Sequence, residues 1–101
     1  MIDEPTFTTR AEAVLAAERV FLPPGTSWAL TMPEVAWDPQ AQLLTHSGAL
    51  PTTLHFGRME LDLKQGEVRF VDEDHRDGGD FVMHRAPLTE AWLTRLRALE
   101  R

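Results

Sequence analysis

The chain has 101 residues, of which 43% are hydrophobic and 26% are charged, and its formal net charge is −6. The length suits one domain, so we expect residues 1–101 to form a single globular unit, with residues 1–8 as a flexible N-terminal segment. The acidic balance argues against direct nucleic-acid binding, and no apolar run is long enough to suggest a membrane span. The lack of cysteine excludes disulfides and thiolate metal sites and suits a cytoplasmic protein.

The first predicted element is a helix over Thr9–Phe21. Thr9 and Glu12 fit a capping box, in which the hydroxyl and the carboxylate each satisfy a free backbone N–H group. Apolar residues recur on one helical face, at Ala13, Ala17 and Val20. The helix should end before Pro23-Pro24-Gly25, because proline lacks a backbone donor and glycine permits a turn.

Several short strands are expected next, over Thr26–Met32, Val35–Trp37 and Leu43–His46. Between the last two, Asp38-Pro39-Gln40 has the chemistry of a turn, because Asp can accept from the backbone and Pro presets φ. A short helical turn over residues 39–44 is the alternative interpretation. Ser47–Thr52 is expected to be a loop.

The clearest local pattern is an antiparallel hairpin from Met59 to Val71 that turns at Gln65-Gly66. Folding about that dipeptide predicts the inward pairs Leu63 with Val68 and Leu61 with Phe70, and the outward pairs Lys64 with Glu67 and Asp62 with Arg69. Before the hairpin, Leu54 and Phe56 should begin a strand, and Gly57 should mark a bend or bulge.

A last strand, Phe81–Arg85, should lead into a C-terminal helix opened by Pro87 and Thr89. That helix carries an apolar stripe at Leu88, Trp92, Leu96 and Leu99. The predicted fold is therefore α+β: an antiparallel meander of five to seven short strands, with an N-terminal and a C-terminal helix packed on it.

The acidic segment Asp72–Asp80 is the most unusual part of the sequence, with five carboxylates and two glycines. Oxygen ligands of this kind suit Ca²⁺, but Arg76 stands where an EF-hand needs a ligand. A solvated hairpin loop is the simpler interpretation, and an anionic contact surface for a basic partner is a third. The candidate binding residues are this segment's acids and one tryptophan in a turn region: Trp37, Asp72, Glu73, Asp74, Asp77 and Asp80.

Neither a metal site nor a catalytic motif is evident. The four histidines, His46, His55, His75 and His84, do not form a recognised short ligand pair. The two serines lie outside any nucleophile motif. We therefore expect no metal and no cofactor, and catalysis is the less favoured interpretation.

These observations favour a small acidic, non-catalytic interaction or regulatory domain of the inhibitor, immunity or adaptor type, as in bacteria or phages. Its partner would be a protein with a basic surface, or a second copy of the chain. One alternative is a structural subunit of a larger assembly, with Val35, Trp37 and Leu43 as an apolar contact patch. The other is a small metal-dependent or acid–base enzyme that uses His55, His84 and the acidic segment.

Overall fold

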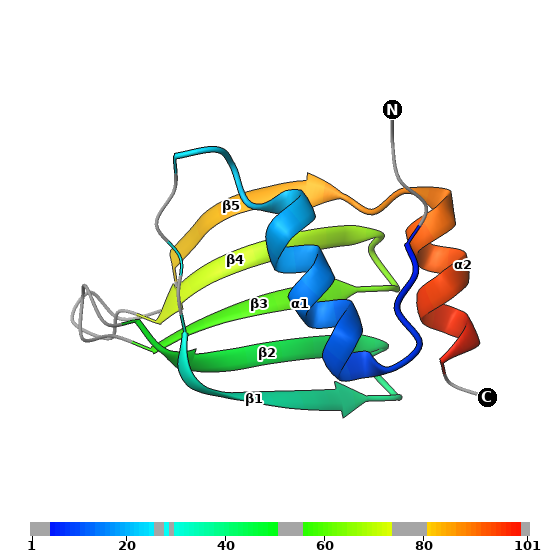
Figure 1. The fold of residues 1–101 in the computed structure, drawn as a ribbon, viewed down its shortest axis with the longest axis horizontal. Helices are drawn as coiled ribbons and strands as arrows, with labels where there is room; N and C mark the ends of the chain where they lie inside the picture. The colour runs from blue at the N-terminus through cyan, green and yellow to red at the C-terminus, as the bar shows by residue number, and fades with distance from the viewer. Residues whose placement is uncertain (1–4, 26–27, 29, 51–55, 74–80, 100–101) are drawn as a thin grey trace.

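Five antiparallel strands and two helices make up the fold (Figure 1). The computed structural model describes residues 5–25, 28, 30–50, 56–73 and 81–99. The elements follow one another in the order α1 (Arg10–Phe21), β1 (Thr31–Asp38), β2 (Leu43–Ala49), β3 (Phe56–Asp62), β4 (Glu67–Glu73), β5 (Phe81–Pro87) and α2 (Glu90–Ala98). Each strand pairs with the next along the chain, so the sheet is a meander. The predicted α+β class is confirmed, with five strands.

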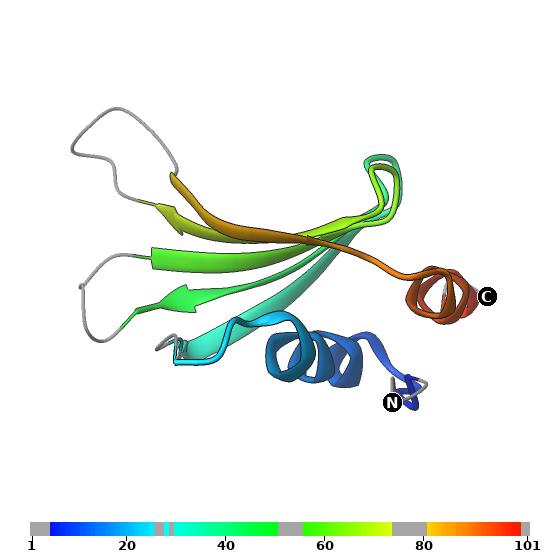
Figure 2. The same cartoon turned by 90° about the horizontal axis from the view of Figure 1, so that it is seen from above.

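Both helices lie on the same side of the sheet (Figure 2). The helix α1 crosses the strands, whereas α2 lies beyond one end of them, where the short turns after β1 and β3 also lie (Figure 1). None of the helices in the described ranges is long and apolar enough to cross a membrane. We call the sheet face under α1 the covered face and the opposite one the open face.

Helix α1 begins as predicted. The Thr9 hydroxyl accepts from the Glu12 backbone N–H at 3.1 Å, and the Glu12 carboxylate accepts from the Thr9 N–H at 3.2 Å, which completes the capping box. Three small side chains face the sheet and are fully buried, at Ala13, Val14 and Ala17. Because they are short, the helix can approach the strands closely.

The core lies between α1, α2 and the covered face. The covered face contributes large side chains at Leu44, Met59, Leu61, Val68 and Phe70. The predicted stripe of α2 is confirmed, since Leu88, Trp92 and Leu96 are buried.

Trp92 joins the two helices. Its ring lies 5.0 Å from that of Phe7 and 5.1 Å from that of Phe21, measured between centroids. Phe7 is buried, and its carbonyl oxygen accepts from Nε of Arg95 at 2.9 Å. Phe7 therefore anchors the described residues before α1 to the core, whereas residues 1–4 of the expected flexible segment lie outside the described residues.

The hairpin between β3 and β4 forms, but its predicted register is wrong by two residues. Leu61 lies opposite Val68, and Asp62 lies opposite Glu67. The cause is a longer turn: the carboxylate of Asp62 accepts from the Gln65 N–H at 2.8 Å, and the Asp62 carbonyl accepts from the Gly66 N–H at 2.8 Å. Gly66 has a φ of 71°, which glycine adopts without strain.

Several element boundaries also differ from the predictions. The expected strand at Thr26–Met32 is wrong for the described residues before Thr31, where β1 begins. The predicted loop at Ser47–Thr52 is wrong for residues 47–49, which belong to β2. The turn after β1 is confirmed, because the Asp38 carboxylate accepts from the backbone N–H groups of Gln40 and Ala41 at 3.0 and 3.2 Å. The alternative of a helical turn there is wrong.

Gly57 does not mark a bulge, since the register on both sides of β3 is continuous. It lies opposite Gly48 on β2, and other groups lie close above both glycines on the covered face. A Cβ at Gly57 would be 2.9 Å from the Leu50 side chain and 3.0 Å from the Trp28 ring. A Cβ at Gly48 would be 2.8 Å from the carbonyl oxygen of Thr31. The two glycines therefore let the chain cross over the end of the sheet.

Candidate binding surface

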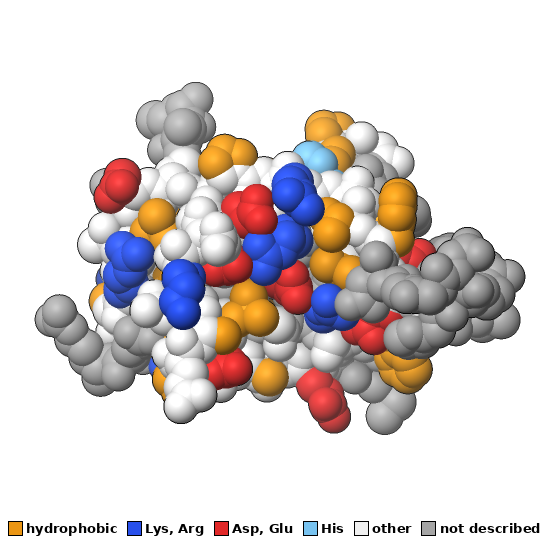
Figure 3. Space-filling model, turned by 180° about the vertical axis from the view of Figure 1, so that it is seen from behind, with side chains coloured by type: hydrophobic (Ala, Val, Ile, Leu, Met, Phe, Trp, Pro, Cys, Tyr) orange, Lys and Arg blue, Asp and Glu red, His pale blue; other side chains and the backbone are white. Residues whose placement is uncertain are grey.

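The open face is not covered by any of the described helices or strands (Figure 2). Because side chains alternate along a strand, the register assigns six carboxylates and three guanidinium groups to it, a net charge of −3. These residues are Glu34, Asp38, Glu60, Asp62, Glu67 and Glu73, with Arg58, Arg69 and Arg85. In Figure 3, acidic and basic side chains gather at the middle of this face, with hydrophobic side chains around them. Half of the chain's net charge thus lies on the open face.

Arg69 is at the centre of the charged cluster. Its Nε donates to Glu60 at 2.8 Å, and its two terminal nitrogens donate to Glu67 at 2.6 Å and to Asp62 at 2.9 Å. The Arg69 side chain is only 17% exposed, although neither of the described helices lies above it. Three strongly held carboxylates thus surround one guanidinium.

Arg58 extends this cluster along β3. Its Nε donates to the second oxygen of Glu60 at 2.7 Å, and its NH1 nitrogen donates to Glu73 at 3.0 Å. Each oxygen of Glu60 therefore accepts from a different arginine. We call Arg58, Glu60, Asp62, Glu67, Arg69 and Glu73 the central ion network.

The network changes the pKa values of two of its members, Glu60 and Arg69. Burial alone would raise the pKa of Glu60, but hydrogen bonds from Arg58 and Arg69, with their charges, outweigh it and lower the pKa below its ordinary value. Burial alone would lower the pKa of Arg69, but its three carboxylate partners raise it further above an already high ordinary value. Both groups therefore stay charged at neutral pH. The charged groups of the network are largely paired with one another.

Two charged side chains of the open face outside the network, Arg85 and Glu34, are exposed and differ from it in their pairing. Arg85 lies opposite Arg69 on β5 and is exposed, and it has no ion pair within the described residues. Glu34 on β1 is also exposed and without an ion pair in the same ranges. The charged groups of Arg85 and Glu34 are therefore accessible to solvent.

Beside Glu34, the open face contains a hollow of about 300 Å³. It is lined by Thr31, Glu34, Ser47, Gly48, Ala49 and Phe56, from three adjacent strands. The Phe56 side chain is 60% exposed, the largest aromatic exposure on this face among the described residues. We call this feature the open-face hollow. It combines an aromatic wall, two hydroxyls and one unpaired carboxylate.

The predicted site residues are distributed differently. Asp72 and Glu73 lie in β4, not in a loop, and Glu73 belongs to the central ion network. Asp72 faces the covered side, opposite Gly57. Asp74, Asp77 and Asp80 lie outside the described residues.

Trp37 lies on the covered face. It is half-buried against the core, and the guanidinium of Arg10 lies 5.0 Å from its ring centroid. By the register, Val35 shares that face, whereas Leu43 is on the open face. The three residues of the suggested apolar patch therefore do not form one surface.

The histidines do not form a metal site within the described ranges, where no three His, Asp or Glu side chains come together as ligands would. His84 lies on the covered face, with its ring 6.0 Å from that of Phe70. His46 is buried beneath α1, and its Nδ1 lies 3.0 Å from a carboxylate oxygen of Glu18. His55 and His75 are not among the described residues.

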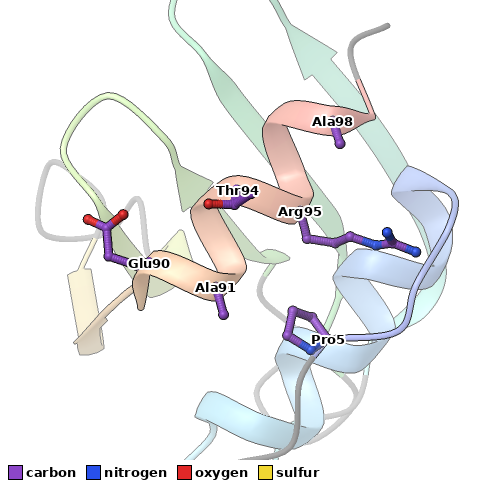
Figure 4. A pocket seen from close by; sticks show the side chains of 6 residues that line it. All are labelled: Pro5, Glu90, Ala91, Thr94, Arg95 and Ala98. Carbon is purple, nitrogen blue, oxygen red and sulfur yellow. The ribbon is translucent and has the colours of Figure 1, made fainter.

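Another hollow, of about 370 Å³, lies between α2 and the segment before α1 (Figure 4). Figure 4 shows Arg95 extending from α2 towards the segment that carries Pro5, whereas Glu90 points away from it. Arg95 already donates to the Phe7 carbonyl, and the carboxylate of Glu90 points away from the hollow. We regard it as a packing gap.

The sequence did not reveal the open-face hollow, although one signal was present. The alternation Phe56, Arg58, Glu60, Asp62 places an aromatic residue on the charged face of β3. A single exposed apolar residue is common on protein surfaces, so this signal alone does not identify a contact site. The other walls come from β1 and β2, whose register the sequence did not predict.

A scan against protein-family models, a search of curated proteins and a search of solved structures each found no match for this chain. The functional inference therefore depends on the residues and their geometry.

Proposed function

We propose that this chain is a small, non-catalytic protein-binding domain that presents the open face of its sheet to a basic surface of another protein. The observation that supports it most is the composition of that face: six carboxylates, three guanidinium groups and an exposed Phe56 beside a hollow. A domain of this kind would act as an inhibitor, immunity protein or adaptor.

The two parts of the open face have different tasks in this proposal. The charged groups of the central ion network hold one another in place, so the network presents a preorganised surface to the partner. The open-face hollow supplies the recognition, with Phe56 as an apolar anchor and Glu34 as a site for a Lys or Arg of the partner. Exposed aromatic side chains and charges that complement the partner are typical of binding hot spots and of fast, selective association.

Affinity capture with the full chain tests the proposal. Wild-type protein and two variants are immobilised, and proteins retained from a host lysate are quantified by mass spectrometry. The double variant Glu34→Lys with Phe56→Ser should lose the partner. The control Glu90→Lys reverses an exposed charge on α2, away from the open face, and should retain it. Binding should also weaken as salt is raised, because the contacting charges are exposed.

Two results would count against the proposal. One is a partner that both variants retain equally, which would place the contact elsewhere. The other is no specific partner together with a monomer in light scattering. If wild-type protein is a dimer and the double variant a monomer, the partner is a second copy of the chain, as in the assembly alternative.

A further inference from the structure

A hollow of about 470 Å³ lies beside α1, on the opposite side of the sheet from the open face. It is lined by Leu15, Glu18, Arg19, Leu22 and Trp28. Three of these side chains are apolar, one is acidic and one is basic. Its volume is within the range of small-molecule sites, about 300–1,000 Å³.

The carboxylate of Glu18 is held in a fixed orientation in this hollow. Its Oε2 accepts from the indole Nε1 of Trp28 at 3.2 Å and lies 3.0 Å from Nδ1 of His46. Trp28 lies before β1 and His46 lies on β2, so the carboxylate is held by two groups from outside α1. Its second oxygen, Oε1, has no hydrogen-bond partner within the described residues. One oxygen thus fixes the group and the other is available.

Glu18 has no permanently charged ion-pair partner among the described residues. Its one ion-pair partner in the described part of the chain is His46, which is charged only when protonated. The Glu18 side chain is 17% exposed, so its carboxylate lies in a largely buried setting. Such a carboxylate is stabilised by an added cation. Arg19 also lines the hollow, but it is exposed, so solvent reduces its repulsion of a bound cation without removing it.

We propose that this hollow binds an organic cation, namely a primary ammonium group carried on an apolar body. The ammonium, which has three donors, donates to Oε1 of Glu18. The apolar body contacts Leu15, Leu22 and the Trp28 ring, whose face also attracts a cation. Because this site is separate from the open face, it can be tested independently of the proposed protein binding.

The probe is 2-phenylethylamine, with 2-phenylethanol and 3-phenylpropanoate as neutral and anionic analogues. Binding is followed on the ¹⁵N-labelled full chain through the indole N–H signals, and the variant Trp28→Phe assigns that of Trp28. The amine should shift this signal and saturate on the order of a millimolar, as expected for a ligand of this size. The alcohol should bind about tenfold more weakly, because it lacks the charge-assisted hydrogen bond, and the acid should not bind.

Substitutions at two positions test the geometry. Glu18→Gln should weaken amine binding about tenfold or more. Because Glu18 also holds Trp28 and His46, a second variant avoids any effect on folding: Leu15→Lys places a cation at an exposed wall of the hollow and should weaken binding about fivefold. The matched control Val20→Lys adds the same charge to an exposed position of α1 that does not line the hollow, and it should bind as wild type does.

Three outcomes would overturn the inference. The alcohol could bind as tightly as the amine. Leu15→Lys and Val20→Lys could have the same effect. The amine could shift the indole signals of Trp37 or Trp92 and leave that of Trp28 unchanged.

Discussion

The substitution Arg69→Met tests whether the central ion network stabilises the fold. Arg69 donates to three carboxylates, two of which belong to the buried residues Glu60 and Asp62. Removing one partner of a buried ion pair costs about 3–5 kcal/mol, because the other charge stays buried without its partner. The third carboxylate, on Glu67, is more exposed and adds little. Glu60 also keeps Arg58, so we expect a loss near the lower limit, about 3 kcal/mol.

Urea unfolding followed by circular dichroism measures this loss. The midpoint should fall while the slope m stays constant, because the substitution changes the free energy of unfolding and not the surface exposed. A double-mutant cycle with Glu60→Gln should give a coupling energy of about 1–3 kcal/mol, as expected for side chains in direct contact.

Arg85→Met is the matched control. Arg85 lies opposite Arg69 in the register on the same face, but it is exposed and has no ion pair among the described residues. Its removal should change the free energy of unfolding by less than about 0.5 kcal/mol. If Arg69→Met also costs under about 1 kcal/mol, the network is an ordinary solvated surface and our reasoning fails.

Three more predictions follow from the fold. Glu60 has a lowered pKa, so its ionised form stabilises the fold above its ordinary pKa of 4.5. This contribution is lost as pH falls through the lowered value. In urea titrations, the difference in free energy of unfolding between wild type and Glu60→Gln should therefore narrow from pH 7 to pH 3. Gly48→Ala should cost about 1–3 kcal/mol, because the new Cβ meets the backbone oxygen of Thr31. Gly57→Ala should cost less, because the atoms nearest to its new Cβ belong to the side chains of Leu50 and Trp28 and not to the backbone. Equal melting temperatures of the two variants would contradict this. Thr9→Ala should cost about 1 kcal/mol through loss of the capping box, and an unchanged thermal midpoint would show that the cap contributes nothing.

Local patterns in the sequence predicted where both helices lie, but Val20, which was expected on the apolar face of α1, is 60% exposed. The capping box at Thr9 and the stripe through Trp92 depend on spacing within a few residues, and both are confirmed. The class of fold followed, because a run of short strands between two helices gives an antiparallel sheet with helical cover.

The hairpin register could not be predicted from hydrophobic alternation, for a physical reason. A slip of two residues keeps every side chain on the same face, so the apolar pattern fits both registers equally. The choice between them depends on the turn, where Asp62 accepts from the backbone and Gly66 takes a positive φ. The sequence suggested a two-residue turn, whereas the capped turn is longer.

The candidate sites were harder to predict because they are assembled from distant segments. The open-face hollow needs the register of three strands, and the Glu18–His46 contact joins residues 28 positions apart. The close approach at Gly57 depends on Leu50 and Trp28 crossing over it. Each of these is a tertiary contact, which alternation along one strand does not encode.

The two faces of the sheet also bear on how such a domain could change over evolution. Consecutive residues of a strand belong alternately to the core and to the open face. Substitutions at Ala36, Thr45, Ser47, Ala49 or Phe56 would therefore alter the surface shown to a partner without disturbing the packing under α1. Among the described residues, the central ion network combines strong internal ion pairs with a position on the open face. If the open face binds a partner as proposed, its exposed positions can change one at a time while the central ion network is kept.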